Sequence, residues 1–161
     1  MISGGIVVSR FVTGFTHTAS SLVCDGVELQ AIADAEGTPL YVYSAAALRE
    51  RFRALDDAFD GYPHALHYAL KANSNLSLGR LLQQLGSAAD ANSVWEIEVA
   101  RRMGFAPHQI VFTGVGKSPA ELEQAVPLGL KAINVESAGE LARIEAIAEK
   151  LGRPARVAVR I

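Results

Sequence analysis

The feature that most constrains the fold of this chain is a strand-and-helix unit that repeats from residue 40 to the C-terminus. Three of its helices share a start, a serine followed three residues later by glutamate, which is the pattern of a capping box. The three pairs are Ser93–Glu96, Ser118–Glu121 and Ser137–Glu140. Helices also share an end, because glycine readily adopts the left-handed conformation that follows a last helical turn. These glycines are Gly86, Gly104, Gly129 and Gly152.

Short apolar segments separate the helices and predict the strands of one sheet. They cover residues 40–43, 64–70, 87–92, 110–112, 132–135 and 156–161. The segment 87–92 is the weakest, because it is rich in alanine and partly polar. Apolar strands that alternate with amphipathic helices are typical of a parallel sheet covered by helices. Further helices are expected after Ser44 and after Ser74 or Asn75.

This alternation predicts an α/β fold, and in particular the first part of a (β/α)8 barrel of the TIM type. Such a barrel takes about 250 residues, whereas only about 120 follow residue 40. A smaller open sheet is the alternative. Residues 1–39 differ in character and predict an N-terminal arm with strands and a short helix at 29–35, which would belong to a β domain. We therefore assign 1–39 to the arm and 40–161 to a truncated barrel.

Composition excludes several classes of function. The formal net charge is −2 and no lysine and arginine cluster is present, so neither a nucleic acid nor a membrane surface is an expected partner. Cys24 is the only cysteine and the histidines lack metal-ligand spacing, which argues against a disulfide or a metal site. The N-terminus lacks the pattern of a signal peptide, so we expect a cytoplasmic protein.

Lys71 is the first candidate for chemistry. It comes at the end of the predicted strand 64–70, within the segment Tyr68-Ala-Leu-Lys-Ala-Asn73. A lysine held in an apolar site loses hydration, its pKa falls, and the free amine can form a Schiff base with a carbonyl group. The alternative is a strand-end lysine that extends its ammonium group into water. The local sequence by itself favours that alternative.

Two further charged residues are predicted to lie near the same edge of the sheet. The carboxyl ends of parallel strands form the edge where β/α proteins bind ligands. Asp90 ends one strand there and could orient a lysine amine or a substrate ammonium group, although it could also be an ordinary turn residue. Arg160 stands within the last apolar strand, where a charge is costly unless paired. It faces either the site or the helices.

The segment 111–118 shares only part of a phosphate-binding P-loop. It ends in Gly116-Lys117-Ser118, but Val111 occupies the position where that motif requires glycine. Nucleotide hydrolysis is therefore not favoured, and Ser118 is interpreted as a helix cap. Lys117 could still reach a site at the strand ends. Glu96 likewise has a capping role, to which a catalytic role would be additional.

Together these segments resemble the alanine-racemase-like barrel family of pyridoxal-phosphate enzymes. The resemblance rests on the Tyr-Ala-x-Lys-Ala-Asn motif at 68–73 and runs from about residue 20 to residue 161. Other matching segments lie at 25–32, 37–43, 110–114 and 133–141. One departure is Trp95, which replaces a glycine of the family and adds bulk near the start of a helix.

The resemblance implies that pyridoxal 5'-phosphate binds covalently to Lys71. It also implies that Asp90 lies beside that lysine and that Arg160 contacts the phenolic oxygen of the cofactor. Glu96 matches a neighbouring family glutamate. Asn73, within the lysine motif, and Lys117 are additional candidates.

The activity implied by the resemblance is decarboxylation of meso-2,6-diaminopimelate to L-lysine by a homodimeric enzyme of lysine biosynthesis. Two alternatives stay open, a sister decarboxylase for ornithine or arginine and a non-catalytic module that binds a cofactor or a partner. Family members are more than twice as long, and their catalytic cysteine is not matched by Cys24. We therefore expect an amino-terminal fragment that is inactive alone and that associates through its open strand edges.

Overall fold

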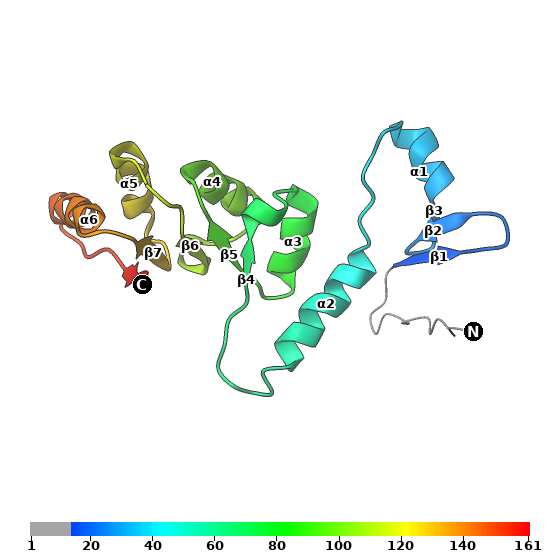
Figure 1. The fold of residues 1–161 in the computed structure, drawn as a ribbon, viewed down its shortest axis with the longest axis horizontal. Coiled ribbons are helices and arrows are strands. Elements are labelled where there is room, and N and C mark those ends of the chain that lie inside the picture. The colour runs from blue at the N-terminus through cyan, green and yellow to red at the C-terminus, as the bar shows by residue number, and fades with distance from the viewer. Residues whose placement is uncertain (1–13) are drawn as a thin grey trace, which may run out of the picture. The chain divides into compact units, whose positions relative to one another are not determined.

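The computed structural model describes residues 14–161, which form two compact units. The first unit ends at Pro63 and contains a three-stranded antiparallel sheet followed by two helices (Figure 1). Its elements are β1 (Phe15–His17), β2 (Leu22–Cys24), β3 (Val27–Glu28), α1 (Leu29–Glu36) and α2 (Ala45–Asp57). The predicted strands and short helix of the N-terminal segment are thus present between residues 14 and 39, while the assignment of 1–39 to a β domain stays a prediction.

Asp25 links the hairpin of the first unit to the start of α2. It precedes Gly26 in the turn between β2 and β3, and both residues have positive φ, as a tight hairpin turn requires. Its carboxylate accepts hydrogen bonds from the Ser44 hydroxyl at 2.7 Å and from the Ala46 N–H at 3.0 Å. The bond from Ser44 is the main reason that the pKa of Asp25 is lowered. Cys24 is buried beside this turn, as expected for a small hydrophobic residue.

Residues 40–43 are not a strand, contrary to the prediction. They form an irregular connection between α1 and α2, and the Tyr41 side chain is 89% exposed. A short apolar segment becomes a strand only where a neighbour offers free backbone groups, and no strand within residues 14–161 pairs with this one. The apolar composition alone therefore predicted the wrong structure here.

The second unit, His64–Ile161, is built on five parallel strands in the order β4-β5-β6-β7-β8. They are β4 (His67–Ala69), β5 (Ala88–Ala91), β6 (Ile110–Phe112), β7 (Ala132–Val135) and β8 (Val157–Val159). Each strand lies beside the next one in the chain, which is the strand order of a barrel. The weak segment 87–92 contains β5, which pairs on both sides.

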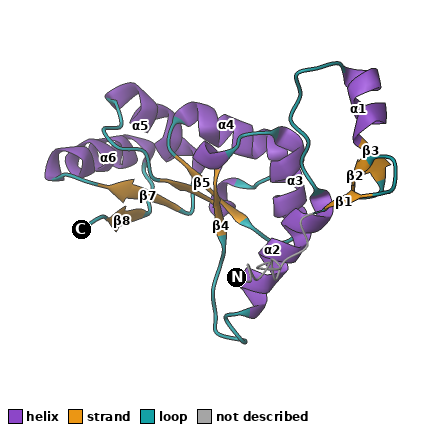
Figure 2. Ribbon diagram, turned by 45° about the vertical axis from the view of Figure 1, so that its right-hand side comes forward, coloured by secondary structure: helices purple, strands orange, loops and turns teal. Residues whose placement is uncertain are grey.

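Four helices connect these strands, and within this unit they lie on one face of the sheet (Figure 2). They are α3 (Leu76–Gln84), α4 (Val94–Met103), α5 (Pro119–Ala125) and α6 (Ala138–Leu151), with 3₁₀ turns η1 (Leu70–Ala72), η2 (Pro107–Gln109) and η3 (Val126–Leu128). The predicted serine caps are confirmed, and Asn75 rather than Ser74 caps α3. Of the three predicted capping boxes only that of Ser118 and Glu121 is complete, because the carboxylates of Glu96 and Glu140 accept from the N–H groups of Asn92 and Glu136 instead. No helix in residues 14–161 is long and apolar enough to cross a membrane.

The core lies between the sheet and the helices, and strand alternation decides which side chains enter it. The inward residues Ala89, Phe112 and Ile133 are almost completely buried, and they pack with Ile97, Leu122 and Ile144 of the helices. The residues between them on the strands, among them Asp90 and Asn134, belong to the opposite face. One-sided helix cover and sequential parallel strands confirm the predicted α/β class, an incomplete (β/α)8 barrel.

Candidate active site at the carboxyl edge of the sheet

Lys71 lies in η1, directly after β4, at the carboxyl edge of the sheet. Leu70 beside it is buried and fixes the turn to the core. The Tyr68 hydroxyl donates a hydrogen bond to the Asn73 carbonyl at 2.9 Å, which closes the turn around Lys71. The side-chain oxygen of Asn73 accepts from the Asn75 N–H at 3.0 Å, so this residue leads into the cap of α3.

The expected apolar surroundings of Lys71 are not found within residues 14–161. Its side chain is exposed, and its amine forms no hydrogen bond or ion pair with another described residue. The reason is local, because the strand ends at Ala69 and the lysine follows on a 3₁₀ turn rather than on the strand itself. The turn presents a primary amine at the open edge.

Asp90 lies within β5, next to Ala69 of β4 in the parallel register, and not in a turn. It is partly buried, and its carboxylate accepts a hydrogen bond from the Thr113 hydroxyl just beyond β6. The Asn134 side-chain amide of β7 donates to the same Thr113 oxygen at 3.1 Å. A continuous polar chain therefore joins three neighbouring strands on the face opposite the helices.

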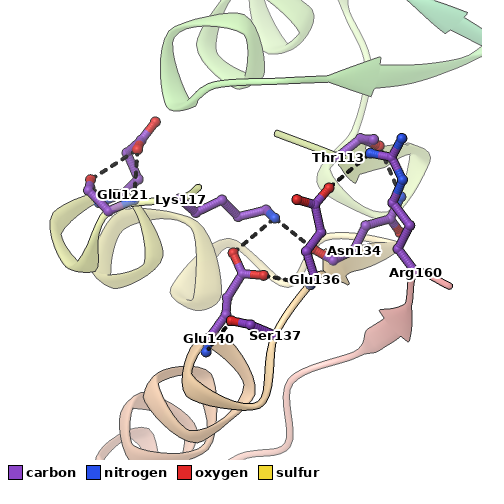
Figure 3. Close-up of polar contacts among 9 residues, drawn as sticks. Thr113, Lys117, Glu121, Asn134, Glu136, Ser137, Glu140 and Arg160 are labelled. Atoms are coloured by element: carbon purple, nitrogen blue, oxygen red, sulfur yellow. Dashed lines mark hydrogen bonds and ion pairs between the residues drawn. The ribbon is translucent and has the colours of Figure 1, made fainter. Parts of the chain in front are cut away.

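Lys117 reaches the same edge from the loop between β6 and α5, but it is buried and paired. Its amine donates to the Asn134 carbonyl at 2.6 Å and forms an ion pair with Glu140 at 3.1 Å (Figure 3). It also lies over the Phe112 ring, 5.2 Å from the centroid. The residue is thus part of the packed framework rather than a free group.

Arg160 lies just after β8 and belongs to the face opposite the helices. Val157 and Val159 pair in register with the buried Ile133 and Val135, so the alternating positions, including Arg160, face the other way. Its guanidinium donates to the Glu136 carboxylate at 2.9 Å (Figure 3). Of the two orientations considered from the sequence, the structure has the one that faces the polar edge.

Glu96 accepts a hydrogen bond from the Asn92 N–H at 2.7 Å, one residue before the Ser93 cap. It supports the junction between β5 and α4, which Gly114 approaches so closely that a Cβ there would lie 2.1 Å from the Asn92 carbonyl oxygen. The Asn92 side-chain nitrogen is buried and has no hydrogen-bond partner among the described residues. Trp95 is 79% exposed, so its bulk is accommodated without repacking this junction.

A separate polar pair lies at the opposite end of the strands. His67, the first residue of β4, accepts from the Lys131 amine at 2.8 Å through Nε2, and its Nδ1 lies 3.3 Å from the Ala89 carbonyl oxygen. Partial burial is the largest cause that lowers the pKa of His67, and the Lys131 charge adds to it. A neutral imidazole that donates from Nδ1 and accepts at Nε2 fits both contacts.

Four residues of the edge were not among the sequence candidates: Thr113, Asn134, Glu136 and Glu140. They lie in segments that share their pattern with the family, at 110–114 and 133–141. For Thr113, Asn134 and Glu136, polarity at the ends of apolar strands was a usable sign, because polar groups placed there need partners. Glu140 lies in α6, and its pattern indicated only a helix start.

Comparison with known proteins shows which family this chain matches. The family model described as pyridoxal-dependent decarboxylase, pyridoxal binding domain, matches residues 45–161. A diaminopimelate decarboxylase of Vibrio cholerae is 44% identical over 140 residues, which are 87% of this chain and 34% of that protein. The chain therefore spans about a third of the length of the curated relatives it matches.

Solved structures of decarboxylases are also similar to this chain. The diaminopimelate decarboxylase of Helicobacter pylori complexed with L-lysine superposes with a TM-score of 0.78 at 45% identity, over 82% of this chain and 34% of that one. A lysine/ornithine decarboxylase from Vibrio vulnificus, complexed with putrescine, gives 0.72 at 25% identity, over 83% and 35%. Because the family model covers well over half of its residues, the chain belongs to the pyridoxal-dependent decarboxylase family and matches its pyridoxal-binding domain.

Proposed function

We propose that the full-length gene product carrying this chain is a pyridoxal-phosphate enzyme that decarboxylates meso-2,6-diaminopimelate to L-lysine. The observation that carries this proposal is Lys71, an exposed primary amine on a turn that Tyr68 and Leu70 hold at the ligand-binding edge of the sheet. The curated relatives named above support the substrate. Their greater length makes the activity a property of the whole protein.

The residues at this edge fit the cofactor by their chemistry. Pyridoxal phosphate carries an aldehyde, a phenolic oxygen and a phosphate, which call for an amine and for cationic donors. Lys71 supplies the amine, and the Arg160 guanidinium, 55% exposed at the side chain, has donors beyond the one that Glu136 accepts. The buried Asn92 side-chain nitrogen, which has no hydrogen-bond partner among residues 14–161, is a further donor beside this edge.

We assign each residue one task. Lys71 would hold the cofactor covalently through its side-chain amine. Asp90 lies one strand away and can stabilise a protonated amine, while Thr113 fixes its carboxylate. Arg160 would donate to the phenolic oxygen, with Glu136 fixing its orientation. When bound, the cofactor supplies an electron-accepting ring that makes loss of carbon dioxide feasible.

Three sequence candidates receive supporting tasks in this proposal. Glu96 stabilises the junction that bears Asn92, Asn73 shapes the turn of Lys71, and Lys117 belongs to the framework behind Arg160. The resemblance also leads us to propose a homodimer for the full-length protein, which its mass in solution would test.

The decisive test of activity is carbon dioxide release by the full-length gene product from meso-2,6-diaminopimelate, L-ornithine and L-arginine at equal concentration. We expect release from diaminopimelate, and loss of that activity in Lys71→Ala. Faster release from ornithine or arginine would assign the protein to a sister decarboxylase. No release from any of them, with cofactor bound, would support a non-catalytic binding protein.

A further inference from the structure

Lys117 is buried although lysines are seldom buried, and the proposed reaction gives it no direct part. Its side chain is 1% exposed, and that of its partner Glu140 is 4% exposed. Burying an ion pair costs solvation that the pairing must recover. The other contacts of this ion pair therefore show which part of the chain it holds in place.

Glu140 uses both carboxylate oxygens. Oε1 accepts from the Lys117 amine at 3.1 Å, and Oε2 accepts from the backbone N–H of Glu136 at 2.9 Å. The carboxylate therefore fixes the chain where β7 passes into α6. Without the lysine, an uncompensated charge would remain in the interior, and Glu140 would have to leave this position.

Glu136 transmits this constraint to the site. Its backbone is held by Glu140, and its carboxylate accepts from Arg160 at 2.9 Å. An exposed guanidinium on a flexible stem has little orientation of its own. The contacts from Lys117 through Glu140 and Glu136 to Arg160 are continuous, as Figure 3 shows.

The junction between β5 and α4 provides an internal comparison. There, Glu96 accepts from the Asn92 N–H as Glu140 does from that of Glu136, but the residue held is an asparagine and no lysine among residues 14–161 pairs with Glu96. At the junction between β7 and α6, each of the two carboxylates has its own cation, Lys117 for Glu140 and Arg160 for Glu136. The extra cation is present where the held residue is itself an anion that pairs with Arg160.

We propose that Lys117 is a positioning residue that, through Glu140 and Glu136, orients Arg160 toward the cofactor. The inference rests on the proposed function only in assigning Arg160 to pyridoxal phosphate. Lys117 touches neither the cofactor nor the substrate in this account. Its effect therefore has to pass through Arg160.

A double-mutant cycle on the full-length gene product tests this, with the dissociation constant of pyridoxal phosphate as the readout. We expect Lys117→Met to weaken binding about 10- to 100-fold, the scale of a lost hydrogen bond to a charged group. In an Arg160→Met background, the same change should alter the constant by less than about twofold. Equal losses in both backgrounds, or none in the wild type, would overturn the proposal.

Further variants separate positioning from stability. Lys117→Met/Glu140→Gln removes both charges and keeps an acceptor for the Glu136 N–H, so binding should largely recover. Ser118→Ala removes the adjacent cap of α5 and should lower the melting temperature without changing cofactor affinity. Weakened binding in Ser118→Ala to the same degree would reduce Lys117 to a structural role.

Glu136→Gln leaves the buried pair intact, so it keeps the test decisive if Lys117→Met does not fold. It should weaken binding in the wild type and not in Arg160→Met, and a loss in both would contradict the proposal. A failure of the proposed function itself would give a different result. If Lys71 does not hold the cofactor, Lys71→Ala would bind pyridoxal phosphate with the same affinity as the wild type.

Discussion

At the residue scale, the environment of Lys71 is defined by its neighbours more than by burial. Leu70 anchors the turn, Tyr68 closes it, and Lys71 extends from it into the open. The sequence segment at 68–73 therefore encodes a shape that presents an amine. The described residues do not bury this amine, so burial is not an argument for its reactivity here.

Tyr68→Phe tests the closure of this turn. Removing the hydroxyl loses its hydrogen bond to the Asn73 carbonyl, which should lower the free energy of unfolding by about 1 kcal/mol. Chemical denaturation of wild type and variant measures the difference. Tyr43→Phe, at a half-exposed tyrosine of the first unit, is the matched control and should change stability little. A Tyr68→Phe variant as stable as the control would show that the bond does not hold the turn.

His67 gives a prediction on pH dependence. Because the folded protein lowers its pKa below the usual 6.5, the unfolded chain binds the proton more readily. The contribution of His67 to the free energy of unfolding is therefore fully present above pH 6.5 and is lost as the pH falls through the pKa of the folded state. Denaturation at about pH 7.5 and about pH 5 should show a smaller difference in His67→Gln than in wild type. An equal difference in both would remove His67 as a cause.

At the element scale, most of the helices and strands follow from start and stop signals in the sequence. Serine caps and left-handed glycines mark the helices, and the strands between them are found within a few residues of their predicted places. The prediction of a strand at residues 40–43 was wrong because strand pairing depends on a neighbouring strand, which a local sequence pattern cannot reveal. Lys71, Asp90 and Arg160 could be placed at one edge by topology, whereas the links through Thr113, Glu136 and Glu140 depend on side-chain geometry.

The close approach of the β6–α5 loop to the β5–α4 junction is testable with two glycines. Gly114→Ala puts a Cβ against the Asn92 carbonyl, so the backbone must move, and we expect a loss of about 1–3 kcal/mol of stability. Gly139 lies in α6, where an added Cβ would lie 3.6 Å from the flexible Arg143 side chain, so Gly139→Ala should stabilise the protein by about 0.5–1 kcal/mol. Thermal unfolding of both variants checks this pair, and equal effects would contradict it.

At the scale of the whole molecule, the five-stranded sheet has two edge strands, β4 and β8. The helices cover one face within the second unit, and Val159 of β8 is exposed. Unpaired backbone groups on such edges favour association between chains. The hydrogen bonds that join Asp90, Thr113 and Asn134 run across the sheet between these edges, so the site depends on strands that are distant in sequence.

We therefore expect residues 1–161, expressed alone, to associate with themselves. Light scattering across a concentration series should show an apparent mass that rises with concentration. A constant monomer mass would mean that the strand edges are protected. Substituting the exposed Val159 with lysine should reduce association, because charge on an edge strand opposes pairing.

The central claim is that Lys71 is the residue that carries pyridoxal phosphate, and borohydride reduction followed by peptide mapping tests it most directly. The full-length gene product is incubated with the cofactor, reduced and digested, and the modified lysine is identified by mass. Lys131 and Lys150 are exposed lysines of the same unit and serve as internal controls. We predict a stoichiometric adduct on Lys71 that is absent from Lys71→Arg. An adduct on another lysine, with Lys71 unmodified, would contradict the account.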